Sequence, residues 1–201
     1  MIKLSIISVF ISLEVMGCTK NEFAPEAYVK STLDAVYHDE YEEYAKFLDI
    51  SEKEAKSNLE QDFEEQIQLE FENFDGIKKD GIKQYQEMMR KVKELAKYEV
   101  AGSKKDDDGS YIVEVRVEPA DIYQTLEQSS MEVSAEKIEQ GLDSSEPEVF
   151  AAVLAESIRK SIEQNTYGKA VTVEVTVSKN NSNTYYLEDT EMEKLAAALF
   201  P

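Results

Sequence analysis

Apolar residues recur at steps of three and four through much of the first half of the chain, which is the period of amphipathic helices. The stripe that follows Pro25 is interrupted by the polar residues 38–40, so we expect either two short helices or one bent helix there. Ser51 and Glu54 have the spacing of a capping box, which predicts the start of a longer helix. A fourth helix is expected over 78–95.

Strict alternation of apolar and polar residues replaces this period at 111–117 and 171–177, as in strands with one buried face. A shorter extended segment that begins at Tyr98 precedes the first strand, and another that ends at Leu187 follows the second strand. A polar turn separates each short segment from its strand. Two hairpins are therefore expected. The turns of these hairpins are expected at 104–110 and 179–183. Three further helices are expected at 120–142, 145–164 and 190–199.

This order of elements predicts an α+β fold. Two hairpins can join into one antiparallel curved sheet of about four strands, packed against the N-terminal helices. The segment 120–165 would then be a helical insertion between the hairpins, and the chain would end in a C-terminal helix. A doubly wound parallel sheet is disfavoured, because strands and helices do not alternate and Gly-rich turns are missing.

Residues 1–17 have the layout of a secretory signal peptide. Lys3 supplies a positive start, and Leu4 to Leu13 is an apolar run of 10 residues. A helix that crosses a bilayer takes about 20 apolar residues, so this run is too short to span one.

The sequence Val15-Met16-Gly17-Cys18 resembles the lipobox of exported bacterial lipoproteins, in which an aliphatic and a small residue precede an invariant cysteine. The resemblance implies cleavage after Gly17 and a diacylglyceryl group on Cys18. Two acyl chains hold a protein stably at a bilayer, so we expect it on the extracellular face of the cell membrane. Residues 18–24 would form a lipidated tether that reaches about 20 Å, and 25–201 a single domain. The alternative is an ordinary signal peptide, or an uncleaved start, with an unmodified cysteine nearby by chance.

The predicted domain is similar to uncharacterised α+β domains of Gram-positive surface lipoproteins. The likeness lies in the opening YVKSTLDAVYHDEYEEYAKFL, a helix followed by a short polar break and a Tyr-rich helix. Such domains often resemble the cystatin-like or nuclear-transport-factor-like cone, in which N-terminal helices cross a curved sheet. The resemblance implies a fold and no activity.

Charge narrows the classes of partner. The formal net charge is −20, which repels nucleic acids, so we expect no nucleic-acid role. Residues 39–74 contain 13 acidic residues and 3 lysines, whereas 78–97 contain 7 basic and 3 acidic residues. We expect these two segments to pair as antiparallel helices with complementary faces. The alternative is that the basic helix faces anionic lipid or wall polymer.

Candidate chemistry is sparse. His38 is the one histidine and is expected to be exposed in the polar break, so a nucleophilic triad is disfavoured. Residues 106–109 are expected to form a hairpin turn, not a calcium loop. Cys18 is the one cysteine, and we expect no metal site and no cofactor. One row of tyrosines falls on a single predicted helical face, at the rim of the core or in a pocket under the sheet: Tyr37, Tyr41 and Tyr44.

Three hypotheses follow. The first is a non-enzymatic lipoprotein that binds a small ligand, a cell-wall polymer or a protein partner. The second is an enzyme of unrecognised type that uses carboxylates and tyrosines in a cone-shaped pocket. The third is a structural accessory subunit held at the membrane through the lipid on Cys18.

Overall fold

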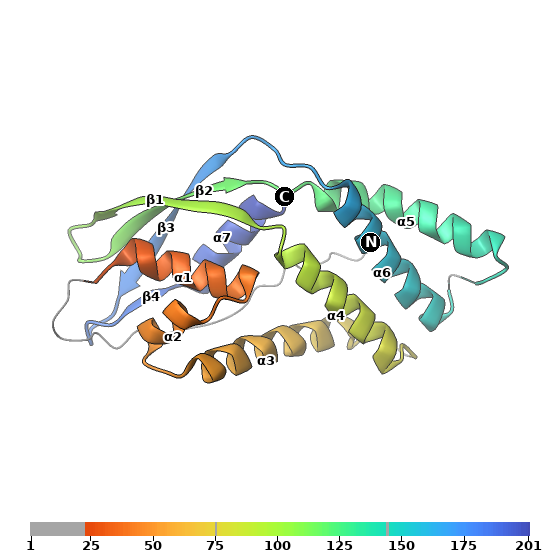
Figure 1. Ribbon diagram of the computed structural model, residues 1–201, viewed down its shortest axis with the longest axis horizontal. Helices are drawn as coiled ribbons and strands as arrows, with labels where there is room; N and C mark the ends of the chain where they lie inside the picture. Colours follow the sequence, from red (N-terminus) through yellow and green to blue (C-terminus); the bar gives the residue numbers. More distant parts are fainter. Residues whose placement is uncertain (1–22, 75, 144) are drawn as a thin grey trace.

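The computed structural model describes residues 23–74, 76–143 and 145–201. The prediction for Cys18 and the signal peptide lies outside the described residues. The described part forms helices and strands in the order α1 (Pro25–His38), α2 (Glu42–Leu48), α3 (Glu52–Phe71), α4 (Lys79–Lys93), β1 (Lys97–Lys105), β2 (Tyr111–Glu118), α5 (Ile122–Glu139), α6 (Pro147–Gln164), β3 (Val171–Lys179), β4 (Tyr185–Leu187) and α7 (Asp189–Leu199) (Figure 1).

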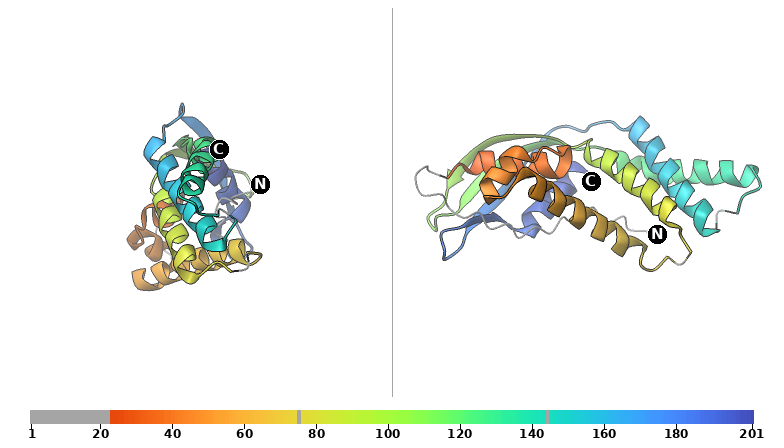
Figure 2. Two further views of the ribbon diagram at one scale, coloured as in Figure 1. Left: turned by 90° about the vertical axis from the view of Figure 1, so that its right-hand side faces the viewer. Right: turned by 60° about the horizontal axis from the view of Figure 1, so that its bottom comes forward.

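The four strands form one antiparallel sheet in the order β1-β2-β3-β4. Valines opposite one another on β2 and β3, such as Val113 and Val175, are fully buried on its inner face. Helices α1 and α7 cover that face (Figure 2), while Glu114 and Arg116 on the other face are exposed. The predicted α+β fold, with two hairpins in one sheet, is confirmed.

The predicted polar break separates two helices. Asp39 ends α1 in the left-handed conformation, with φ of 57°, and its N–H donates to the carbonyl of Asp34. Ser51 caps α3, because its hydroxyl accepts from the N–H of Glu54 at 3.2 Å. The first hairpin turn is shorter than expected: β1 continues to Lys105, and the turn occupies 106–110.

Helices α5 and α6 pack against each other, and α6 packs against α4, away from the sheet (Figure 1). This helical hairpin leaves and rejoins the sheet at one place, because Ala120 forms a bridge with Tyr167. The carboxylate of Asp121 also accepts from the N–H of Thr166 at 2.7 Å. We call α5 and α6 the helical end, and the sheet together with α1, α2 and α7 the sheet end.

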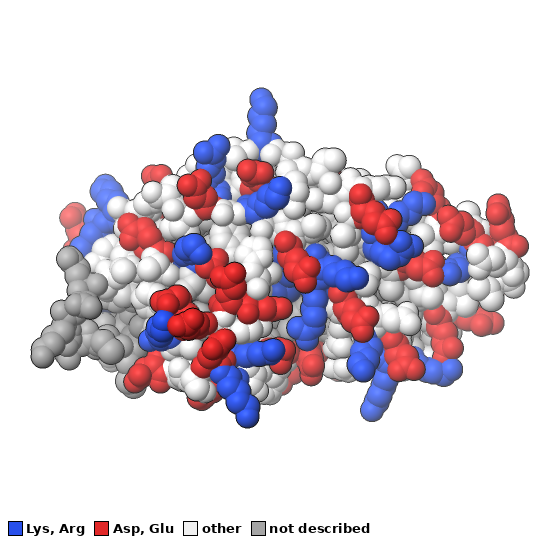
Figure 3. Space-filling view, in the orientation of Figure 1, with Lys and Arg blue, Asp and Glu red and all other residues white. Residues whose placement is uncertain are grey.

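The acidic and basic segments do meet, through α3 and α4. Among the described residues, however, no ion pair joins them. Tyr85 of α4 instead donates to the Glu70 carboxylate at 2.7 Å, and Arg90 lies 4.8 Å from the centre of the Phe63 ring. Acidic and basic side chains are interspersed on the face that Figure 3 shows. Burial raises the pKa of Glu70 above its usual range.

Candidate functional site

The three tyrosines of the predicted pocket all lie in the core. The break at Asp39 places Tyr37 on α1 and Tyr44 on α2, with Tyr41 between them, so the single helical face is divided. The Tyr41 hydroxyl donates to Asp39 at 2.7 Å, whereas the Tyr44 hydroxyl is buried and has no hydrogen-bond partner in the described part of the chain. Burial raises the pKa of all three phenols, so they are neutral at pH 7. A ligand pocket at these residues stays a prediction.

An open hollow of about 490 Å³ lies where the end of α1 meets β1 and β2. On β1 and β2, Lys97 pairs opposite Glu118 and Glu99 opposite Arg116, so its lining is rich in charge. The hollow is lined by His38, Ala96, Lys97, Tyr98, Glu99, Arg116 and Glu118. Charged side chains line the hollow and can hydrogen-bond to a polar ligand, and the open mouth lets such a ligand enter from solvent.

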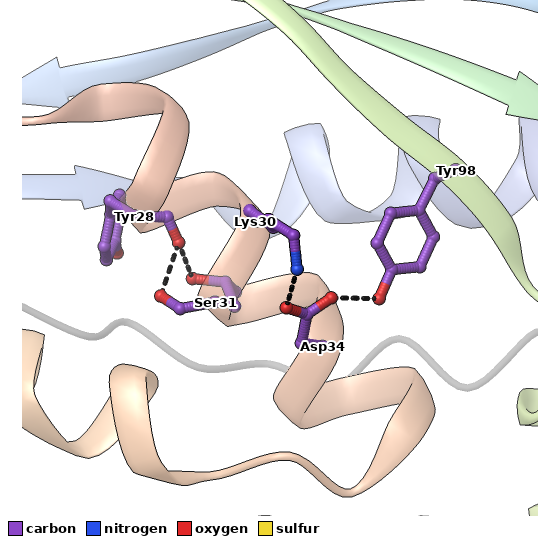
Figure 4. A network of polar contacts seen from close by, with 6 residues as sticks. Tyr28, Lys30, Ser31, Asp34 and Tyr98 are labelled. Atoms are coloured by element: carbon purple, nitrogen blue, oxygen red, sulfur yellow. Dashed lines mark hydrogen bonds and ion pairs between the residues drawn. The ribbon is translucent and has the colours of Figure 1, made fainter.

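Two aromatic rings shape one side of this hollow. The exposed His38 ring stacks on Tyr98, with ring centres 5.3 Å apart and planes inclined at 25°. The Tyr98 hydroxyl donates to Asp34 at 2.8 Å, and Lys30 forms an ion pair with the same carboxylate (Figure 4). Burial, with the neighbouring Asp34 carboxylate, raises the pKa of Tyr98. The tyrosine is therefore fixed in place and remains protonated.

A half-buried lysine, Lys93, lies between α4 and α3. The ammonium of Lys93 is 5.2 Å from the centre of the Phe63 ring, on the side of α4 that faces α3. Burial lowers its pKa from 10.5 to about 8, although the Asp39 carboxylate acts in the opposite direction. Sequence reasoning missed this group. Its signal was the three-residue step from Arg90 to Lys93, which places both cations on one side of α4.

Aromatic rings also gather where the described chain begins. Phe23 stacks on Tyr185, with ring centres 4.0 Å apart and planes within 9° of parallel. The ring of Phe23 is also 5.8 Å from Tyr111 and 6.3 Å from Phe47. We call Phe23, Tyr28, Phe47, Tyr111 and Tyr185 the aromatic cluster. It joins the end of the predicted tether to α1, α2, β2 and β4.

Within residues 23–74, 76–143 and 145–201, no helix is both long and apolar enough to cross a bilayer. The same residues contain no group of three or more His, Cys, Asp or Glu side chains that could hold a metal ion.

No family model matches the sequence, and no curated protein matches it. Among solved structures, a Bacillus subtilis strain 168 protein described as a "putative lipoprotein (ycdA)" has a similar fold, with a TM-score of 0.60 over 87% of this chain. The two sequences are 15% identical, and this chain spans 55% of the length of that protein. At this identity the similarity shows the fold alone.

Proposed function

We propose that this chain is an exported lipoprotein, anchored through a diacylglyceryl group on Cys18, whose domain serves as a binding or accessory module at the extracellular face of the membrane. The observation that carries the proposal is the position of the one cysteine, directly after Val15-Met16-Gly17 and a 10-residue apolar run. The Bacillus subtilis protein of similar fold is itself described as a lipoprotein, which supports the same reading.

Two surface features bear on what the module binds. The hollow beside His38 is open and lined with charged groups, which suits a polar polymer such as a wall component. On α5, Met131 and Ile138 are 61% and 60% exposed, and their seven-residue spacing places them on one helical face. Leu142, in the turn after α5, is 45% exposed. Exposed apolar rows of this kind favour a protein partner.

The anchoring is tested by phase partitioning of the full chain expressed in a bacterium that processes lipoproteins. We expect the protein to enter the detergent phase, and its N-terminal peptide to begin at Cys18 with the mass of a diacylglyceryl group. Cys18→Ala should shift the protein to the aqueous phase. Met16→Ala is the matched control, because the second residue before the cysteine is the tolerant position of a lipobox, so membrane binding should persist. A free thiol on a mature Cys18, or unchanged partitioning of Cys18→Ala, would refute the anchor.

The ligand class is tested by charge substitutions on the two surfaces. A protein partner at α5 predicts that Ile138→Glu abolishes a cross-link formed in intact cells from a photoreactive residue at position 142, while Arg116→Ala leaves it unchanged. A wall polymer at the hollow predicts the converse: Arg116→Ala weakens sedimentation with purified wall, and Ile138→Glu does not.

A further inference from the structure

The start of the described chain lies at one end of the long axis of the molecule. The beginning of α1, the β1–β2 turn at 106–110 and the β3–β4 turn at 180–184 are at that end, and the α5–α6 turn is at the opposite end (Figure 1). Phe23 is the fifth residue after Cys18. Five extended residues span about 17 Å at most, so the tether ends close to the lipid.

The aromatic cluster fixes the tether to this end. Because the Phe23 ring stacks on Tyr185 at 4.0 Å, the chain is held against the sheet before α1 begins. Two lysines flank the stack: Lys105 lies 5.4 Å from the Tyr111 ring centre, and Lys179 lies 5.5 Å from that of Tyr185. Both lysines are exposed, and Phe23 and Tyr185 are half-buried.

This combination of aromatic rings and flanking lysines is typical of residues at a bilayer interface. Tyr28 and Tyr111 of the cluster are buried in the core, so the rings that can reach lipid are the half-buried Phe23, Phe47 and Tyr185. A tyrosine at the headgroup level keeps an apolar body in lipid and a hydroxyl in water, and lysines extend their ammonium groups toward the headgroups. The β1–β2 turn also carries three aspartates, and their negative charge offsets that of the nearby lysines. The aspartates are Asp106, Asp107 and Asp108, and the lysines are Lys104, Lys105 and Lys179. The contact should therefore not depend on anionic lipid.

We propose that the half-buried rings of the aromatic cluster and the two hairpin turns form the membrane-contacting end of the protein, so that the helical end points away from the bilayer. This inference rests on the proposed function, because the acyl chains on Cys18 bring the domain to the lipid. The short tether and the stacked Phe23 ring then decide which end faces it.

The single cysteine makes the orientation measurable. Once Cys18 is lipidated, a cysteine introduced elsewhere is the one free thiol and can carry an environment-sensitive fluorophore. Asn181→Cys marks the β3–β4 turn and Gln140→Cys marks the far end; both positions are outside the core. The lipidated protein is placed in phosphatidylcholine vesicles whose headgroups carry a nitroxide quencher. We expect quenching several times stronger at position 181 than at 140, with the same ratio when phosphatidylglycerol is added.

Vesicle flotation separates the two ways of failing. A protein that does not float with the vesicles refutes the anchoring itself. A protein that floats but shows equal quenching at both positions, or stronger quenching at 140, refutes the orientation alone. A ratio that rises with phosphatidylglycerol shows a charge-driven contact and refutes the assignment to the aromatic cluster.

A variant of the cluster tests its part in the contact. Phe23→Ala in the Asn181→Cys protein should reduce the quenching at 181 while flotation and the helical circular dichroism signal stay unchanged. Phe74→Ala is the matched control, because that ring is 38% exposed and stacks on Phe150, outside the cluster. Unchanged quenching in Phe23→Ala would overturn the role of the stack.

Discussion

The sheet end and the helical end are stabilised by different kinds of contact. At the sheet end, large apolar side chains are excluded from water, and Leu33, Leu195 and Leu199 are 0% exposed. At the helical end, the buried contacts between α5 and α6 include serines, and Ser161 donates to Ser129 at 3.0 Å. Because burial of apolar area is the main source of folding free energy, most of the stability should reside at the sheet end.

At the helical end, small residues let neighbouring helices approach each other closely. A Cβ atom at Gly81 of α4 would lie 2.9 Å from the Cβ of Ala151 on α6, so glycine allows these two helices to touch. Between α5 and α6, Lys137 forms an ion pair with Glu156 at 2.8 Å. This pair is partly buried, with the Lys137 side chain 15% exposed. The helical end buries Ile122 and Ile158 together with smaller valines and alanines, while Met131 and Ile138 are exposed.

The largest expected difference comes from one substitution made at both ends. Leu195→Ala removes a fully buried side chain of α7 and should lower the free energy of unfolding by about 2–5 kcal/mol. Leu142→Ala removes a side chain that is 45% exposed and should change it by less than about 0.5 kcal/mol. Urea denaturation measures both. Equal losses would show that the Leu142 side chain is far more buried than its exposure of 45% indicates.

The sequence predicted the sheet end well, because its signals are local. Alternation in β2 and β3 arises from one buried face, and it can be read from seven consecutive residues. The junction with the helical end gives no such signal: Asp121 and Thr166 meet although 45 residues separate them. The polar break predicted an interruption near Asp39 but not whether one helix bends or two form, since the left-handed backbone decides that.

The candidate functional residues also fall into those that a local pattern reveals and those that depend on contacts between distant parts of the chain. A lipobox consists of adjacent residues, so Cys18 could be proposed from sequence, although no described residue tests it. The contact of Phe23 with Tyr185 joins distant parts of the chain, and the low pKa of Lys93 depends on packing against α3. Neither could be predicted from a pattern. The three tyrosines were foreseen as apolar positions, and their burial confirms no more than that.

A pH-dependent effect is expected on α4, the helix that contacts both α6 of the helical end and α1 of the sheet end. Because the pKa of Lys93 falls to about 8 in the fold from 10.5, the unfolded chain binds more protons between these pH values, and stability should rise with pH across that window. Lys93→Met should therefore stabilise the protein at pH 7, on the order of 2 kcal/mol, and the gain should fade toward pH 10.5.

Lys91→Met is the matched control for this prediction. Lys91 lies on the same helix and is exposed, so its substitution should give no pH-dependent gain. Thermal unfolding from pH 6 to pH 10.5 measures both variants. Parallel curves for Lys93→Met and the wild-type chain would contradict burial as the cause.

A smaller effect is expected inside the helical end. Ser161→Ala leaves the buried Ser129 oxygen without its donor and should lower the free energy of unfolding by about 1–2 kcal/mol. The double variant with Ser129→Ala removes both hydroxyls and should lose less than the two single variants added together. A double-mutant cycle by urea denaturation gives the coupling. Strict additivity would mean that close packing alone holds α5 against α6.

The smallest effects distinguish two tyrosines within the sheet end. Tyr41→Phe removes a hydrogen bond to the Asp39 carboxylate and should destabilise the fold by about 1 kcal/mol. Tyr44→Phe removes a buried hydroxyl that has no partner among the described residues, so it should be neutral or slightly stabilising. Urea denaturation of both variants is the measurement. If Tyr44→Phe instead destabilised the protein as much as Tyr41→Phe, an ordered water or a ligand would have to satisfy the Tyr44 hydroxyl, and the pocket predicted beside it would gain its first direct support.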